Sequence, residues 1–148
     1  MKNLKIIVLS FICIFVINCS ENSETTSNED TLTGKWMLVE TYVTYGANGE
    51  WIGDFMPAPE ELIYSYTLNN DGTFTSTKFE DCQSGNYTFS SSEIIFDFEC
   101  EGFTAGIENP PGTFKENYTF DNRNLILTPQ YLLCVEGCGW KFVKVIEQ

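Results

Sequence analysis

The sequence predicts an all-β chain of about eight short strands, arranged as an antiparallel barrel or sandwich. Three observations lead to this prediction. From Leu32 onward, short runs of aromatic and β-branched residues alternate with polar residues. Gly, Asn, Asp and Pro residues separate these runs at hairpin spacing. After the apolar N-terminal segment, no stretch shows a convincing helical period.

In chain order, the first expected strand begins at Leu32, and the second covers residues 62–68, where apolar and polar residues alternate. Asp71-Gly72 favours a hairpin turn because both residues tolerate positive φ angles. The return strand then covers residues 74–78. Residues 46–60 are rich in Gly and Pro, so we expect a long loop there, with one helical turn over residues 58–62.

The second half of the chain continues the same pattern. We expect strands at residues 87–89, 94–98, 114–120 and 125–127. A closing hairpin is expected from residues 131–135 and 140–146, around Glu136-Gly137. A barrel closed in this way has no free sheet edges, which suits a monomer.

The first eighteen residues are typical of a secretory signal peptide. Lys2 and Lys5 give a basic start, and residues 6–17 are almost uninterrupted apolar sequence. A run of about a dozen residues is too short to span a bilayer comfortably, whereas it suits the apolar core of a signal peptide.

Residues 16–20, Val-Ile-Asn-Cys-Ser, resemble the lipobox of bacterial lipoproteins, in which the chain is cut before a cysteine that then carries lipid. Asn18 is similar to the residue found there in the looser lipoboxes of Bacteroidetes. The resemblance implies lipid on Cys19 and a protein anchored in the bacterial outer membrane. The domain would then face either the periplasm or the cell surface. An ordinary signal peptide followed by a stray cysteine is the alternative.

Residues 19–31 are expected to form an acidic tether to a domain over residues 32–148. Residues 20–30 contain no apolar side chain and cannot bury a core. The leader holds two of the eight basic residues and none of the 21 acidic ones, so the remaining chain has six basic residues and a net charge of −15. This charge disfavours nucleic acid as a partner and suits a basic protein or calcium ions, and the alternative is that it only keeps a tethered surface protein soluble.

The chain has no histidine, which excludes serine–histidine and cysteine–histidine catalysis and imidazole metal ligands. Carboxylates such as Asp97 and Glu99 share the polar side of one expected strand, as on a solvent-facing sheet. We therefore expect no enzyme activity, no cofactor and no metal site.

Four cysteines remain after Cys19, and an even number in an exported chain indicates two disulfides. Three pairings are possible, of which we favour Cys82–Cys100 and Cys134–Cys138. A four-thiolate zinc site is the alternative, although the spacing lacks paired Cys-x-x-Cys motifs.

Gly34-x-Trp36 at the start of the first strand is similar to the Gly-x-Trp signature of the lipocalins. Residues 32–145 resemble the lipocalin-like lipoproteins of Bacteroidetes. The resemblance implies an eight-stranded antiparallel up-and-down β-barrel, in which Gly34 and Trp36 are structural. It also implies that Trp36 plugs one end under a basic side chain from the last strand, here Lys141 or Lys144.

This fold favours a lipid-anchored binding protein for a small, mainly apolar ligand or lipid. The expected lining residues are aromatic: Tyr64, Tyr66, Phe96 and Tyr118. Trp51, Phe55 and Met56 in the long loop are expected to cover the pocket, or alternatively to fold back as a plug. The rings could also fill a small barrel completely. The second hypothesis is a surface interaction or inhibitor lipoprotein that binds another protein through its acidic outer face.

Overall fold

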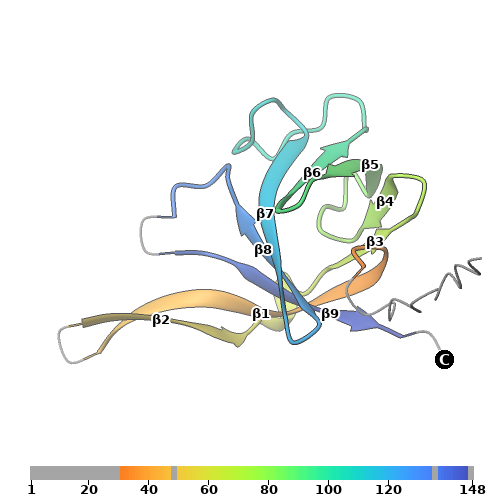
Figure 1. The fold of residues 1–148 in the computed structure, drawn as a ribbon. Coiled ribbons are helices and arrows are strands. Elements are labelled where there is room, and N and C mark those ends of the chain that lie inside the picture. The colour runs from red at the N-terminus through yellow and green to blue at the C-terminus, as the bar shows by residue number, and fades with distance from the viewer. Residues whose placement is uncertain (1–30, 48–49, 135–136, 147–148) are drawn as a thin grey trace, which may run out of the picture.

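The computed structural model describes residues 31–47, 50–134 and 137–146. The predicted signal peptide, Cys19 and nearly all of the tether lie outside the described residues. Figure 1 shows an all-β fold with a single short 3-10 turn, η1 (Glu60–Leu62), within the described part of the chain. The strands are β1 (Gly34–Ala47), β2 (Glu50–Pro57), β3 (Ser65–Leu68), β4 (Thr73–Ser76), β5 (Ser84–Phe89), β6 (Glu93–Phe98), β7 (Thr113–Asp121), β8 (Asn124–Pro129) and β9 (Trp140–Val145).

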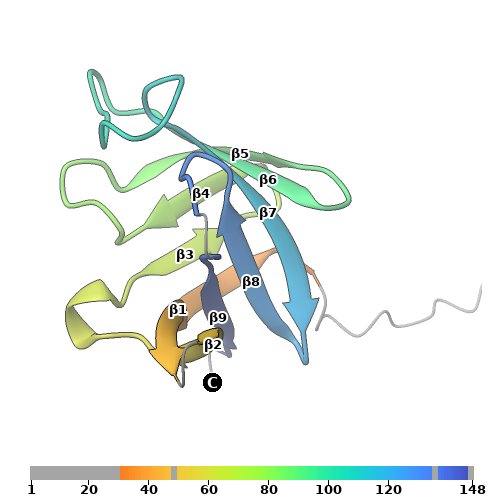
Figure 2. The ribbon, with the colours of Figure 1, turned by 90° about the vertical axis from the view of Figure 1, so that its left-hand side faces the viewer.

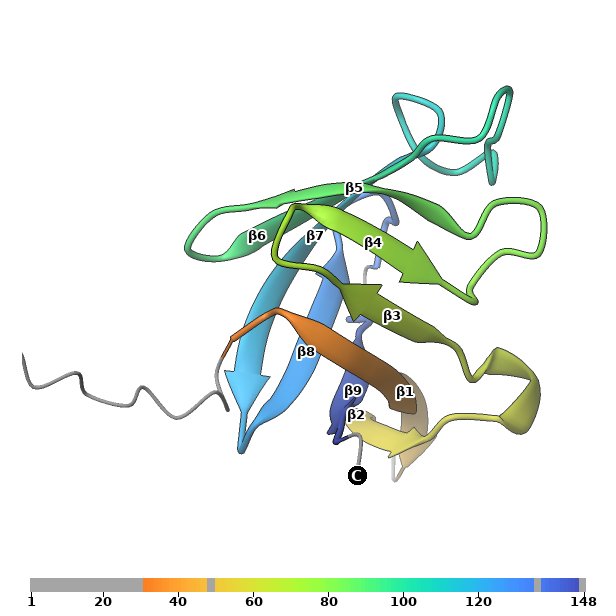
Figure 3. The same ribbon diagram turned by 90° about the vertical axis from the view of Figure 1, so that its right-hand side faces the viewer.

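The sheet closes on itself because β1 pairs with β9 as well as with its sequence neighbours. Antiparallel neighbours follow one another from β3 to β9, and β9 returns to β1, as Figures 2 and 3 show from opposite sides. Eight strands form the closed barrel and β2 is additional. The predicted eight-stranded antiparallel barrel is therefore confirmed, and the sandwich alternative is wrong.

Strands β2 and β3 pair with different parts of the same edge of β1. Residues 34–37 of β1 pair with β3, and residues 40–47 pair with β2, on the same side of β1. The Leu38 N–H donates to the Tyr64 carbonyl and the Ala58 N–H donates to the Val39 carbonyl, so residues 58–64 leave and rejoin the ladder. This excursion contains the predicted helical turn, and it opens one side of the barrel end.

The β1–β2 hairpin corrects one prediction. Residues 46–60 were expected to be a loop over the barrel mouth, but β2 pairs with β1 over its whole length and the hairpin projects away from the barrel (Figure 1). The register between β1 and β9 shifts between Leu38 and Glu40, as at a β-bulge. Such a bulge bends a strand, which allows β1 to leave the barrel and continue into the hairpin.

A second correction concerns the closing hairpin. Residues 131–134 do not form a strand, and the strand that pairs with β9 is β8. The Cys134–Cys138 disulfide, with Cα atoms 5.6 Å apart, closes a tight loop before β9. Cys82 and Cys100 form the other disulfide, with Cα atoms 5.7 Å apart. Both favoured pairings are confirmed, and the zinc alternative is wrong because the thiols are bonded to one another.

The two ends of the barrel differ in their connections. At the short-turn end, tight turns follow β3, β5 and β7, and Asn122 and Arg123 both have positive φ, as a two-residue hairpin turn requires. Longer connections meet at the opposite, long-loop end: residues 58–64, 77–83, 99–112 and 130–139. Residue 31 lies at the short-turn end, where the Lys144 ammonium donates to the Thr31 carbonyl.

Aromatic side chains fill the barrel interior. Tyr66 stacks on Phe96 with ring centroids 4.4 Å apart, and Phe74 packs edge-on against Phe96 at 5.2 Å. Trp36 is fully buried at the short-turn end, and its indole N–H donates to the Leu32 carbonyl at 2.7 Å. The Lys144 ammonium lies 5.2 Å from the Trp36 ring, which is the cation–π contact expected from the last strand.

Phe96→Ala should lower the free energy of unfolding by about 3–5 kcal/mol, because it removes a fully buried ring from this stack. Phe89→Ala, at a ring that is 60% exposed, is the matched control and should cost about 0.5 kcal/mol or less. Urea unfolding measures both values. Equal losses for the two variants would contradict a packed interior at Phe96.

Candidate functional site

A pocket of about 300 Å³ opens at the long-loop end, beside the excursion of residues 58–64. Its walls are mainly apolar and come from β1, the excursion, the loop after β4, and β9. The lining residues are Leu38, Glu61, Leu62, Ile63, Tyr64, Thr77, Lys78, Phe79 and Trp140. Four of these residues bring polar groups to the wall: the Lys78 ammonium, the Glu61 carboxylate, and the hydroxyls of Tyr64 and Thr77.

Lys78 lies just after β4, and its side chain crosses the barrel end with only 14% of its surface exposed. Its ammonium nitrogen lies between 5.1 and 5.8 Å from the centroids of five aromatic rings: Tyr64, Phe79, Phe114, Tyr131 and Trp140. Ring faces attract a cation, and the attraction is stronger where water is excluded. The rings therefore form an aromatic box that holds a positive charge at the inner side of the pocket.

Glu116 supplies the opposite charge from the interior of the barrel. It follows Phe114 by two residues in β7, so it points inward, and its side chain is fully buried. Its Oε1 lies 3.9 Å from the Lys78 ammonium nitrogen. The Tyr131 hydroxyl joins the two, because it accepts from Lys78 and donates to Glu116 Oε1, both at 3.3 Å.

Three buried polar atoms of this cluster make no hydrogen bond of normal geometry within the described part of the chain, although the two tyrosine hydroxyls interact with one another: Tyr64 Oη, Tyr66 Oη and Glu116 Oε2. Buried polar atoms in folded proteins nearly always have a partner, which is protein or an ordered molecule. Tyr64 lines the pocket, and its ring lies 5.5 Å from that of Tyr66. The unsatisfied atoms are thus concentrated in one place, beneath the pocket.

Burial determines the protonation of the cluster. It raises the pKa of Tyr64 and of Tyr66 well above the ordinary value, so both hydroxyls keep their protons and can donate. Burial also raises the pKa of Glu116 and lowers the pKa of Lys78, while the attraction between the two groups opposes both shifts. Burial therefore disfavours the charged form of each group, and their mutual attraction favours it.

Glu108 organises the loop of residues 99–112 beside the cluster. Its Oε1 accepts hydrogen bonds from the Thr104 hydroxyl and from the Ala105 and Gly112 N–H groups at 2.7–3.0 Å. Its Oε2 accepts from the Ile107 N–H at 3.0 Å. Burial would raise its pKa, but these hydrogen bonds lower the pKa from 4.5 to about 2.

The predicted lining residues are only partly brought together. Tyr64 lines the pocket, Tyr66 lies beneath it, and Phe96 is packed deeper in the core. Tyr118 lies at the short-turn end, where its hydroxyl donates to the Ser90 carbonyl at 2.7 Å. Tyr118 is therefore remote from the pocket, because successive inward residues along β7 occupy different depths of the barrel.

Two of the predicted lid residues, Phe55 and Met56, are not among the residues that line the pocket. Phe55 packs edge-on against Tyr42 at 5.4 Å, and the Lys141 ammonium lies 4.5 Å from its ring. Met56 is 46% exposed on the hairpin. The backbone of Trp51 pairs with Gly46 in the same hairpin. Phe55 and Met56 therefore belong to a paired strand and not to a loop over the barrel mouth.

The sequence analysis missed Lys78, Glu116 and Tyr131. Alternation along residues 114–118 placed Phe114 and Tyr118 on the inward face, and the same period places Glu116 between them. An acidic residue at an inward position was the available signal. The contacts of Lys78 and Tyr131 had no such signal, because both residues lie in connections between strands.

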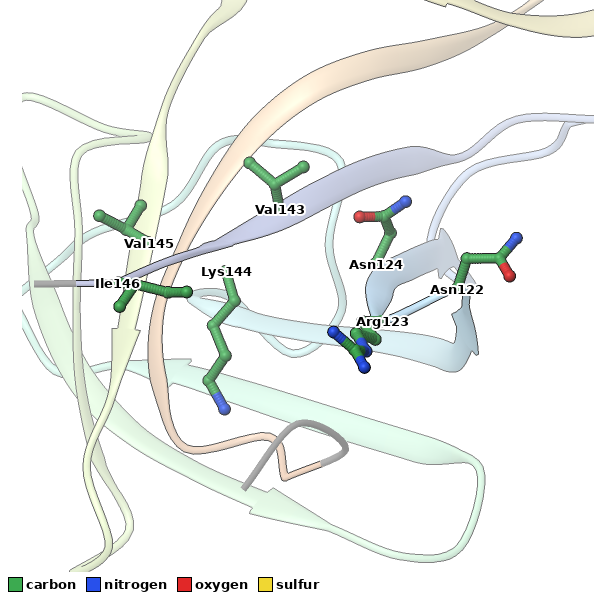
Figure 4. Close-up of a pocket in the computed structure, with 7 residues that line it drawn as sticks. All are labelled: Asn122, Arg123, Asn124, Val143, Lys144, Val145 and Ile146. Carbon is green, nitrogen blue, oxygen red and sulfur yellow. The ribbon is translucent and has the colours of Figure 1, made fainter. Parts of the chain in front are cut away.

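Another cavity, of about 530 Å³, lies on the outside of the short-turn end. Figure 4 shows Asn122, Arg123 and Asn124 from the turn between β7 and β8 facing residues 143–146 of the chain end. Val143 and Val145 extend from one side of β9 and Lys144 from the other (Figure 4). None of the three unsatisfied buried atoms borders this cavity, so the long-loop end is the stronger candidate site.

No family model matches the chain, and no curated protein and no solved structure shows significant similarity to it. Among residues 31–47, 50–134 and 137–146, no helix is long and apolar enough to cross a membrane. In the same ranges, no three His, Cys, Asp or Glu side chains are grouped so that they could hold a metal ion.

Glu108→Gln should destabilise the protein by about 1–3 kcal/mol at pH 7, because an amide cannot accept from all four donors as the carboxylate does. The pKa of Glu108 is lower in the folded state, so its contribution is complete above about pH 4.5 and is lost as the pH falls toward 2. Urea unfolding at pH 7 and at pH 2 should show a stability difference between Glu108→Gln and the unaltered protein at pH 7 only. Glu101→Gln, in the same loop but exposed, is the control, and a difference that persists at pH 2 would contradict this role.

Lys78→Met should lower the free energy of unfolding by about 3–5 kcal/mol at pH 7, because it leaves Glu116 buried without a cation. The double variant with Glu116→Leu should lose less, since no uncompensated charge remains. Urea unfolding of both single variants and the double variant measures the coupling. Additive losses would show that the two side chains do not stabilise one another.

Proposed function

We propose that this protein binds a small, mainly apolar ligand in the pocket at the long-loop end. The observation that carries the proposal is the position of three unsatisfied buried polar atoms beneath an apolar opening. Apolar walls with a few converging polar groups are typical of small-molecule sites. Leu62, Ile63 and Trp140 would contact the apolar part of the ligand, and Tyr64 and Lys78 its polar end.

The filled interior limits the size of this ligand. Tyr66, Phe74 and Phe96 occupy the centre of the barrel, so the ligand would lie in the mouth and not along the barrel axis. A pocket of about 300 Å³ is at the lower end of the range for ligand sites, which favours a short chain or a single ring system.

We also propose that Cys19 carries lipid and anchors the protein to the outer membrane. The described chain begins at the short-turn end, where Thr31 is held by Lys144. An anchor there would leave the long-loop end facing away from the membrane. The pocket would then be accessible to molecules in the surrounding solution.

A second candidate function is binding to a basic protein. Exposed acidic residues surround the long-loop end in three of its connections: Glu60, Glu61, Glu80, Asp81 and Glu101. Such a concentration of charge attracts a cationic surface and loses its effect at high salt. Association with a basic protein that disappears as salt is raised, with no small-molecule binding, would favour this function over the first.

Octan-1-ol should bind the folded protein, and replacing Leu62 and Ile63 together by Ser should weaken binding about tenfold by removing apolar contact. Both side chains are about half exposed (53% and 46%), so stability should be nearly unchanged. Isothermal titration calorimetry measures the affinity. The control is Val43→Ser with Ile52→Ser on the hairpin, at similar exposure (41% and 42%). Equal affinity in all three proteins would contradict binding at this pocket.

A further inference from the structure

We infer that Lys78 captures apolar aldehydes or ketones by forming an imine at its ammonium nitrogen. The inference rests on the proposed ligand pocket and names the reactive class of its ligand. Among the described residues, Lys78 is the lysine that lines this pocket. The remaining lysines of this part of the chain, which are Lys35, Lys115, Lys141 and Lys144, lie elsewhere on the barrel.

The surroundings of Lys78 favour the neutral amine that the reaction requires. A lysine becomes nucleophilic when it is held away from water in an apolar pocket, and Lys78 is only 14% exposed among aromatic rings. Burial lowers its pKa, which acts in the same direction. Lys78 lines the pocket and 14% of its side chain is exposed, so a molecule bound in the pocket lies beside this side chain.

Glu116 and Tyr131 provide the path for the protons. The ammonium of Lys78 loses one proton to Glu116 Oε1, either directly over 3.9 Å or through the Tyr131 hydroxyl, which lies 3.3 Å from each group. Burial raises the pKa of Glu116, which helps the carboxyl group to hold that proton. The protonated Tyr64 hydroxyl, which makes no hydrogen bond of normal geometry, can donate to the carbonyl oxygen of the bound molecule.

The steps balance without another reactant. The Lys78 nitrogen forms a bond to the carbonyl carbon as the carbonyl π electrons move to oxygen, and a proton passes from nitrogen to that oxygen. The proton held by Glu116 then joins the hydroxyl group, which leaves as water while the nitrogen lone pair forms the carbon–nitrogen double bond. One ammonium and one aldehyde become one protonated imine and one water, and Glu116 is again a carboxylate.

The product suits the same surroundings as the ammonium. The protonated imine keeps a positive charge at the nitrogen, where the five rings and Glu116 already stabilise a cation. The apolar chain of the aldehyde would occupy the pocket beside Leu62 and Trp140. Formation of the imine therefore requires no new charge and no rearrangement of the filled core.

The test uses octanal with sodium cyanoborohydride, which reduces an imine to a stable secondary amine, followed by peptide mass mapping. Lys78 should gain an octyl group about tenfold faster than Lys115. Lys115 is the matched control, because its ammonium nitrogen lies 2.9 Å from Glu93 but its side chain is 47% exposed outside the pocket. Octan-1-ol, which cannot form an imine, should protect Lys78 and leave Lys115 unchanged.

Lys78→Arg keeps a cation beside Glu116 but has no amine that can form an imine, so the octyl group at this position should be absent while the labelling of Lys115 stays unchanged. If this variant does not fold, the comparison of Lys78 with Lys115 in the unaltered protein still decides. Equal labelling of the two lysines, or no protection by octan-1-ol, overturns the inference and leaves the binding function intact. Failure of octan-1-ol to bind contradicts the proposed function instead, whichever lysine is labelled.

Discussion

The pairing of β1 with β9 is the constraint on which the rest of the structure depends. It converts a row of antiparallel strands into a closed wall, and it sets Leu38 opposite Phe142 and Trp36 opposite Lys144. Every inward side chain then faces the same enclosed space and is shielded from water. Without this closure, Glu116 and Lys78 would meet solvent, and the unusual protonation of the cluster would have no physical basis.

The interior combines a packed aromatic core with a polar cluster that is not fully satisfied. The rings around Phe96 contribute the apolar burial that stabilises the barrel. The polar cluster lowers the stability of the barrel, since buried charges and unpaired hydroxyls cost free energy. Replacing a buried ion pair with apolar residues often stabilises a protein, so a buried Glu116 at the inner side of the pocket is one argument for the proposed binding function.

The outer surface of the barrel differs in charge from the buried cluster of Lys78 and Glu116. The acidic side chains that give the chain its negative charge are mostly on the surface, and several surround the long-loop end. Such a field repels free anions from the mouth. Neutral molecules can enter without this penalty, and a neutral carbonyl compound is therefore a better match for the pocket than a carboxylate.

The sequence by itself determined the all-β class and most of the antiparallel hairpins, and it favoured the observed set of disulfides among three possible pairings, because alternation, turn residues and cysteine number are local or countable properties. It also indicated that Trp36 would meet a lysine from the last strand. Only the tertiary structure showed that β2 is a paired strand, since the Gly and Pro residues of 46–60 resemble those of a loop. The site could not be derived either: Tyr64, Lys78, Glu116 and Tyr131 come from four separate segments, and only closure of the barrel brings them within reach of one another.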